Sequence, residues 1–233
     1  MALTVALLVF SVIKRSVFSE SIALGSAGTW GITLFCSFVT YFLIRTMLAK
    51  WLAYADENTG EEEAEKAFRK LQVGASCYVA FAHGSNDVSN SISPVVAIFL
   101  VINTGLVPVA GAALPPIPLW ILMLGGVGMV VGIALLGHKV MATLGNKITL
   151  MNNSKGFSVD FATATTVVLA SLLAMPVSST HAATGAIVGV ALDKGHRGLN
   201  LGILIKIFSA WVITVPMAAI LTILIYWLLE LIF

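Results

Sequence analysis

Charged side chains are scarce in this chain: Asp, Glu, Lys and Arg together make up 10% of its 233 residues. So low a share, beside 58% hydrophobic residues and a mean hydropathy of +0.98, excludes an ordinary water-soluble domain. The formal net charge is only +2, which gives no reason to expect nucleic acid as a partner. We therefore expect an all-α, multi-pass integral membrane protein, surrounded by the lipid bilayer of the plasma (cell inner) membrane.

Cysteine is also rare, and Cys36 and Cys77 both lie in hydrophobic segments without the spacing of a metal site. We expect two buried thiols. An intramembrane enzyme built on His83, Asp87 and His181 is the weakest functional hypothesis, because no nucleophile with a partner base, metal pair or nucleotide loop accompanies them. The sequence thus predicts neither enzyme activity nor a cofactor.

The apolar runs within residues 1–52 predict two transmembrane segments. The first apolar run, residues 1–13, forms a helix of only about 20 Å, against a hydrocarbon core of about 30 Å. The basic pair at residues 14–15 follows this run, whereas a signal peptide carries its basic residues first, so we expect a truncated span. Residues 30–52 are long enough to cross the membrane.

The charged residues concentrate in residues 53–70, where we expect a short cytoplasmic helix that is separate from a membrane segment at residues 71–102. Its expected i,i+4 ion pairs are Glu62–Lys66 and Glu65–Arg69. Further spans are predicted at residues 119–136, where Gly128 and Gly132 have the spacing of a close helix contact, and at residues 198–229.

Residues 157–192 form two apolar runs separated by a polar turn. Lys155 and Arg197 flank the segment, and both favour the cytoplasm. The simplest topology is a re-entrant helical hairpin with its tip at residues 178–181. The alternative is a pair of ordinary spans, each about 17 residues long, joined at Pro176.

The stretch from His83 to Pro94 places polar side chains between two hydrophobic runs. Asp87 is its ionisable group, and such a group inside a membrane segment costs a few kcal/mol, about 3 on insertion scales. Gly84 permits a break, after which Ser85 or Asn86 would cap a new helix. We expect a broken helix whose free carbonyls hold a cation and whose free amides hold an anion. A polar packing contact that pairs Asp87 with a donor is the alternative.

A second polar break repeats this pattern. Pro176 ends one half-helix, Ser178 can cap the next, and Ser179, Thr180 and His181 follow at its start. Helix N-termini with hydroxyl side chains but no nearby Lys or Arg favour an oxyanion site made of backbone dipoles and neutral donors. A nearby carboxylate would repel the anion unless a cation lay between them, so the pattern predicts cation-coupled anion transport. Helix capping and interhelical packing are the alternative roles of these residues.

The residues from Gly84 to Pro94 resemble the Gly-Ala-Asn-Asp-Val-Ala-Asn-Ala-Ile-Gly-Pro signature of the inorganic phosphate transporter (PiT) family. The resemblance covers about residues 66–190, including Pro176 to His181. It implies a secondary active symporter of inorganic phosphate coupled to sodium or protons, with inverted repeats around a site near the bilayer midplane. Residues 71–233 would form the second-repeat transport domain.

The resemblance and the residue chemistry together assign the candidate site. The expected phosphate-binding residues are Ser85, Asn86, Asn90, Ser178, Ser179 and Thr180. The expected coupling-cation residues are Asp87, Asn86, Asn90 and Thr180, with Asp87 the ligand of sodium if sodium is the coupling ion. His83 and His181 are possible accessory residues.

The chain departs from the family pattern in two ways. Serines replace alanine at positions 85, 89 and 91 and glycine at 93, which adds hydroxyls that could alter substrate or ion preference. The signature occurs once rather than twice, so the chain looks like a C-terminal half that needs the missing first-repeat half or a homo-oligomer. A sulfate permease of the same family and a non-transporting membrane subunit are the alternative functions.

Overall fold

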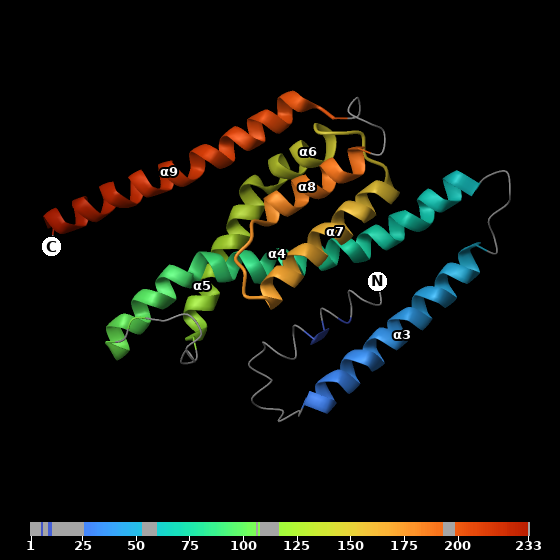
Figure 1. Cartoon of the computed structure of the whole chain (residues 1–233), viewed down its shortest axis with the longest axis horizontal. Coiled ribbons are helices and arrows are strands. Elements are labelled where there is room, and N and C mark those ends of the chain that lie inside the picture. The colour runs from blue at the N-terminus through green and yellow to red at the C-terminus, as the bar shows by residue number, and fades with distance from the viewer. Residues whose placement is uncertain are drawn as a thin grey trace.

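The computed structural model describes residues 6, 9–10, 26–52, 60–105, 107, 117–192 and 199–232. These ranges contain helices and no strand, which confirms the all-α prediction. The predicted span at residues 1–13 lies outside the part that can be described. The elements with known bounds are α3 (Ser26–Leu52), α4 (Gly60–Thr104), α5 (Leu119–Gly132), the π-helix η1 (Ile133–Gly137), α6 (His138–Asn146), α7 (Asn153–Leu172), α8 (Ser179–Ala191) and α9 (Leu201–Ile232) (Figure 1).

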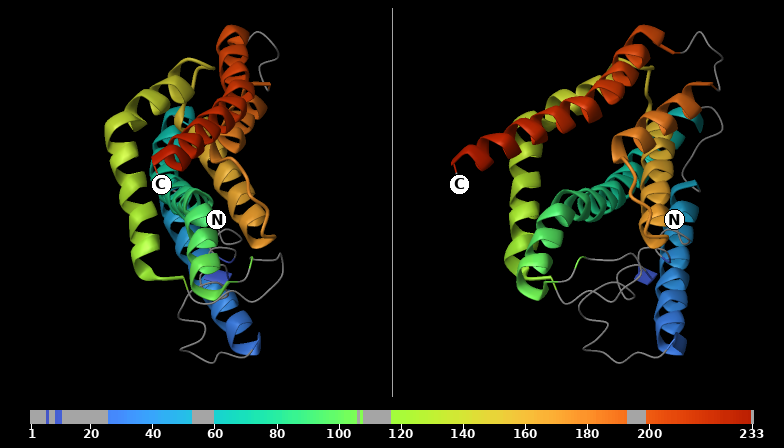
Figure 2. Two further views of the ribbon diagram at one scale, coloured as in Figure 1. Left: turned by 90° about the vertical axis from the view of Figure 1, so that its left-hand side faces the viewer. Right: turned by 60° about the vertical axis from the view of Figure 1, so that its left-hand side comes forward.

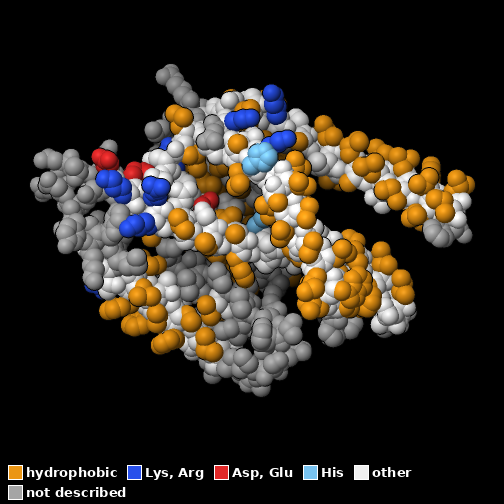
Figure 3. All heavy atoms as spheres, turned by 180° about the vertical axis from the view of Figure 1, so that it is seen from behind, with side chains coloured by type: hydrophobic (Ala, Val, Ile, Leu, Met, Phe, Trp, Pro, Cys, Tyr) orange, Lys and Arg blue, Asp and Glu red, His pale blue; other side chains and the backbone are white. Residues whose placement is uncertain are grey.

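Three helical stretches are long and apolar enough to cross a membrane: residues 64–104, 119–145 and 201–232. Helix α3 covers the predicted span at residues 30–52. Figure 3 shows hydrophobic side chains along the projecting helices, with Lys and Arg gathered away from their free ends. The chain is a multi-pass integral membrane protein.

Helix α4 is continuous, so the predicted break after Gly84 is wrong. Pro94 lies inside the helix and cannot donate a backbone hydrogen bond. Serine hydroxyls bond to the helix's own carbonyls nearby: Ser89 donates to Ser85 at 2.7 Å and Ser93 to Ser89 at 2.8 Å. Such local bonds help a membrane helix to tolerate proline, so one helix carries the whole polar stretch.

A separate charged helix was predicted at residues 53–70; residues 53–59 lie outside the described residues, and the charged residues from 61 to 70 belong to α4. The Glu62–Lys66 pair is present at 3.7 Å. Glu65 instead bonds to the start of α7, where its carboxylate accepts from the Asn153 amide and the Ser154 hydroxyl, each at 2.8 Å. A carboxylate suits the positive end of a helix, so Glu65 anchors α7 to α4.

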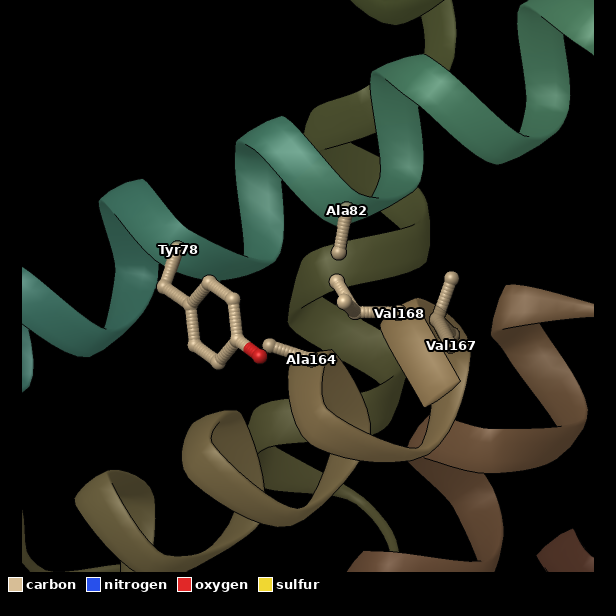
Figure 4. Packing of buried hydrophobic residues seen from close by; sticks show 5 residues of the cluster. All are labelled: Tyr78, Ala82, Ala164, Val167 and Val168. Atoms are coloured by element: carbon tan, nitrogen blue, oxygen red, sulfur yellow. The ribbon is translucent and has the colours of Figure 1, made fainter. Parts of the chain in front are cut away.

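Helices α4 and α7 run side by side in the same direction. Their shared core consists of Tyr78, Ala82, Ala164, Val167 and Val168 (Figure 4). Helix α8 then returns beside α7, so the predicted helical hairpin is confirmed (Figures 1 and 2). The packing places the connection between α7 and α8 against the polar stretch of α4.

The predicted span at residues 119–136 extends through η1 and α6 to Asn146. Its close contact with α4 is at Gly125, where an added Cβ would overlap the Cγ2 atom of the buried Ile92. A Cβ on Gly128 or Gly132 would meet nothing within 4 Å. These two glycines therefore do not make the close contact predicted from their spacing within the described structure.

We expect Gly125→Ala to destabilise the chain by about 1–3 kcal/mol, because Ile92 is branched at Cβ and has no space to move. The matched control is Gly128→Ala, which adds the same methyl group on an open face of α5 and should be neutral or slightly stabilising. Thermal unfolding in detergent measures both variants. Equal melting temperatures for the two variants would contradict the assigned contact.

Candidate functional site

The site lies where one face of α4 meets the α7–α8 connection. His83, Asp87 and Asn90 are spaced at i, i+4 and i+7, so they share a face of the helix. Asn86 stands four residues before Asn90 and points to the same neighbour. The sequence spacing therefore gathers two amides, a carboxylate and an imidazole without any break in α4.

The Asp87 carboxylate is held by three side chains. The Asn86 amide donates to Oδ1 at 2.6 Å, and the Ser179 hydroxyl donates to Oδ2 at 2.8 Å. His83 Nδ1 lies 2.9 Å from the same Oδ2 and also 2.9 Å from the Ser179 hydroxyl. The amide and the hydroxyl orient the carboxylate without adding charge, and His83 balances its negative charge only when the imidazole is protonated.

Helix α7 ends in a Schellman motif, in which the amides of Ala174 and Met175 bond back to Ser171 and Ala170. Ala174 has φ of 57°, a left-handed conformation in which glycine is the usual residue. The chain is then non-helical until Ser178, whose hydroxyl accepts from the His181 amide at 3.3 Å and caps α8. The break predicted at Pro176 is therefore confirmed.

Asn86 connects α4 to this non-helical segment. Its side chain is 5% exposed, and its amide donates both to the Val177 carbonyl at 2.8 Å and to Asp87. The Asn90 amide reaches the same carbonyl at 3.5 Å. The buried carboxamide thus fixes the connection and the carboxylate together.

A cleft of about 530 Å³ opens between these elements. Its lining consists of Asp87, Asn90, Ser91, Pro176, Val177, Ser178, Ser179 and Thr180. Helix geometry leaves the amides of Ser179 and Thr180 without intrahelical acceptors at the start of α8. On the opposite wall, Pro94 cannot donate to the Asn90 carbonyl. The cleft therefore offers amides suited to an anion and oxygens suited to a cation.

Six of the predicted site residues meet here: Asn86, Asp87, Asn90, Ser178, Ser179 and Thr180. Ser85 does not join them, because two residues along a helix turn the side chain by about 200°. Its hydroxyl donates to the Ala82 carbonyl instead. His83 reaches the site through Asp87, whereas the ring of His181 packs on Trp211.

Ser91, which was expected to add a hydroxyl to the polar stretch but was not assigned to the site, lines the cleft four residues after Asp87. Sequence reasoning missed one contributor. The Val177 carbonyl is a backbone acceptor and carries no signal in its residue type.

Cys77 is exposed and Cys36 half-buried, so the expectation of two buried thiols is wrong.

A carboxylate beside the N-terminus of a helix that follows a break, in a membrane chain whose described residues form helices and no strand, is an arrangement typical of transporter binding sites. The sequence matches the model of the Phosphate transporter family over residues 1–222. The chain belongs to this family.

Relatives and a solved structure support this assignment. A predicted phosphate permease of Pyrococcus furiosus is 45% identical over 182 residues, which cover 78% of this chain and 42% of the relative. The human sodium-dependent phosphate transporter 1 is 40% identical over 160 residues, 69% of this chain and 23% of the relative. The solved structure, described as the sodium-dependent phosphate transporter, matches with a TM-score of 0.83 and 37% identity.

That match covers 100% of this chain and 55% of the solved chain. A predicted phosphate permease of Haemophilus influenzae is 38% identical over all of this chain and 55% of its own length. The chain therefore spans about half the length, or less, of these relatives.

We expect Asn86→Ala to lower the free energy of unfolding by about 1–3 kcal/mol, because it removes a buried amide and leaves the half-buried Val177 carbonyl without its 2.8 Å donor. Asn103→Ala is the matched control: Asn103 is exposed and donates only to the Phe99 carbonyl within its own helix. Thermal unfolding of both variants in detergent gives the comparison. A melting temperature for Asn86→Ala no lower than that of the control would refute the bridging role.

Proposed function

We propose that this chain is the ion-binding part of a sodium-coupled phosphate symporter, with phosphate at the N-terminus of α8 and sodium at Asp87. The observation that carries the proposal is that Ser179 has two roles. It is the first residue of α8, beside the cleft, and its hydroxyl donates to Asp87 at 2.8 Å. One residue thus joins the anion side of the cleft to the cation side.

The anion side supports binding of phosphate without a basic side chain. Ser179 and Thr180 line the cleft and contribute two backbone amides that lack intrahelical acceptors, and Thr180 adds a hydroxyl, whereas the Ser179 hydroxyl proton is donated to Asp87. Ser178 adds a hydroxyl at the cap of the same helix. The positive end of the helix dipole and several neutral donors suit a tetrahedral oxyanion.

The cation side supports a hard, oxygen-bound ion. Asp87 and Asn90 both line the cleft and supply side-chain oxygen atoms. The backbone carbonyl of Asn90 is a further oxygen ligand, because Pro94 cannot donate to it. A bound sodium ion would cancel the repulsion between Asp87 and phosphate. Binding of each ion would then favour the other, which is the basis of symport. The human relative and the solved structure are both described as sodium-dependent, which supports sodium rather than protons.

Phosphate is favoured over sulfate on chemical grounds. Sulfate is fully deprotonated at neutral pH, whereas phosphate retains a proton in part and can donate to an acceptor such as Asp87. The relatives named above are described as phosphate permeases or transporters. Excess unlabelled sulfate should therefore leave uptake of labelled phosphate unchanged, and strong competition by sulfate would support the sulfate-permease alternative.

The central test is uptake of labelled phosphate into proteoliposomes that contain the chain. We expect uptake to require an inward sodium gradient and to fall at least about tenfold in Asp87→Asn, which removes the charge that holds the cation. Asp160→Asn is the matched control, because Asp160 is a carboxylate on α7 that bonds to Ser76 and does not line the cleft.

Uptake driven by a proton gradient without sodium would overturn sodium coupling, and equal uptake in Asp87→Asn and wild type would overturn the site. If the folded chain alone takes up no phosphate, uptake is measured again with two proteins in the same liposomes. These are this chain and the part of the Haemophilus influenzae relative that lies outside the match. Uptake in that case alone would identify the chain as a subunit, and equilibrium binding of phosphate to the chain tests the site in either case.

A further inference from the structure

Helix α9 contacts the hairpin through a short seam at its beginning. The half-buried residues are Ile203, Leu204, Ile207 and Trp211, which fall on one face of the helix. The first three pack on a cluster that contains Ile187 of α8. From residue 212 to residue 232 every side chain is exposed. Trp211 is therefore the last half-buried residue of α9 among the described residues. Figure 1 shows α9 extending away from the hairpin toward the C-terminus.

Trp211 ends this seam on His181. The two ring centroids are 3.7 Å apart with an interplanar angle of 36°, a close aromatic contact. His181 is the third residue of α8, and its amide is held by the Ser178 cap. Ser179 and Thr180, which line the cleft, are its immediate neighbours. The indole thus packs on the turn of helix that forms one wall of the cleft.

The start of α8 is held from two sides. On the α4 side, Ser179 bonds to Asp87 and to His83. On the α9 side, the contact is the Trp211 ring on His181. The Asn86 amide holds the Val177 carbonyl in the connection that leads into α8, and Ala182 of α8 packs on the core shared by α4 and α7. The Trp211 ring adds a contact from the α9 side, so it helps to set where the amides and hydroxyls of this end lie.

We propose that Trp211 is a positioning residue for the cleft: its contact with His181 fixes the N-terminus of α8 opposite Asp87. The inference rests on the proposed function and adds a residue to it that lies outside the cleft. Binding groups act at full strength only when the surrounding residues hold them within about 0.5 Å of the required geometry. Loss of the indole removes the contact of α9 with His181 and weakens phosphate binding.

The first test compares three variants in sodium-driven phosphate uptake. We expect Trp211→Ala to raise the KM for phosphate about tenfold, and Trp211→Phe, which retains a ring, to stay within about threefold of wild type. Trp227→Ala is the matched control, because Trp227 is an exposed tryptophan of the same helix, beyond the seam. Its KM should equal that of wild type.

The second test is spectroscopic and does not depend on the stability of Trp211→Ala. The other four tryptophans, Trp30, Trp51, Trp120 and Trp227, are replaced by phenylalanine, which leaves Trp211 as the sole indole. Phosphate added in sodium buffer should change the emission of Trp211, because the ring lies on the helix end that binds the anion. His181→Ala in this background should abolish the change.

A KM for Trp211→Ala equal to that of Trp227→Ala would overturn the proposal, as would Trp211 emission that does not respond to bound phosphate. Failure of the proposed function gives a different result: the wild-type chain neither takes up nor binds phosphate. The positioning role fails alone when wild type binds phosphate and either of the two Trp211 measurements stays unchanged.

Discussion

The hydrogen bonds across the interface between α4 and the hairpin determine the geometry of the cleft. Asn86 donates to the Val177 carbonyl, and Ser179 donates to Asp87. These bonds satisfy buried polar groups that lie in apolar surroundings, where an unpaired group is costly. The carboxylate, the non-helical connection and the start of α8 are therefore placed by one network. A different register between the helices would leave several polar atoms without partners.

A continuous α4 is compatible with ion chemistry, although the polar stretch was predicted to require a break. The side chains, rather than freed amides, provide most of the polar groups on this wall. Pro94 lets one carbonyl lie free while the helix continues. The two walls consequently differ in character: α4 contributes a carboxylate, amide side chains and oxygen atoms, and α8 contributes backbone amides and hydroxyls. This asymmetry fits a pair of ions of opposite charge.

Much of this arrangement could be predicted from the sequence. Apolar run lengths predicted the spans, and the break at Pro176 and the cap at Ser178 followed from local chemistry. The continuity of α4 could not be predicted. The sequence shows Gly84 and Pro94, but it does not show whether hydrogen bonds from nearby serine hydroxyls give a continuous helix a lower free energy than a broken one. Likewise, residue spacing nominated Gly128, whereas the contact at Gly125 depends on which face of α5 meets α4.

The two helices of the hairpin, α7 and α8, contact α4 to very different extents. At its start α7 is tied to α4 by Glu65, and along its length the two helices share a buried core. Just beyond its end, Asn86 grips the backbone at Val177. Helices α4 and α7 therefore form one closely packed unit. Helix α8 shares far less with α4, so the two walls of the cleft are joined mainly by the side-chain hydrogen bonds of Ser179 rather than by a packed core.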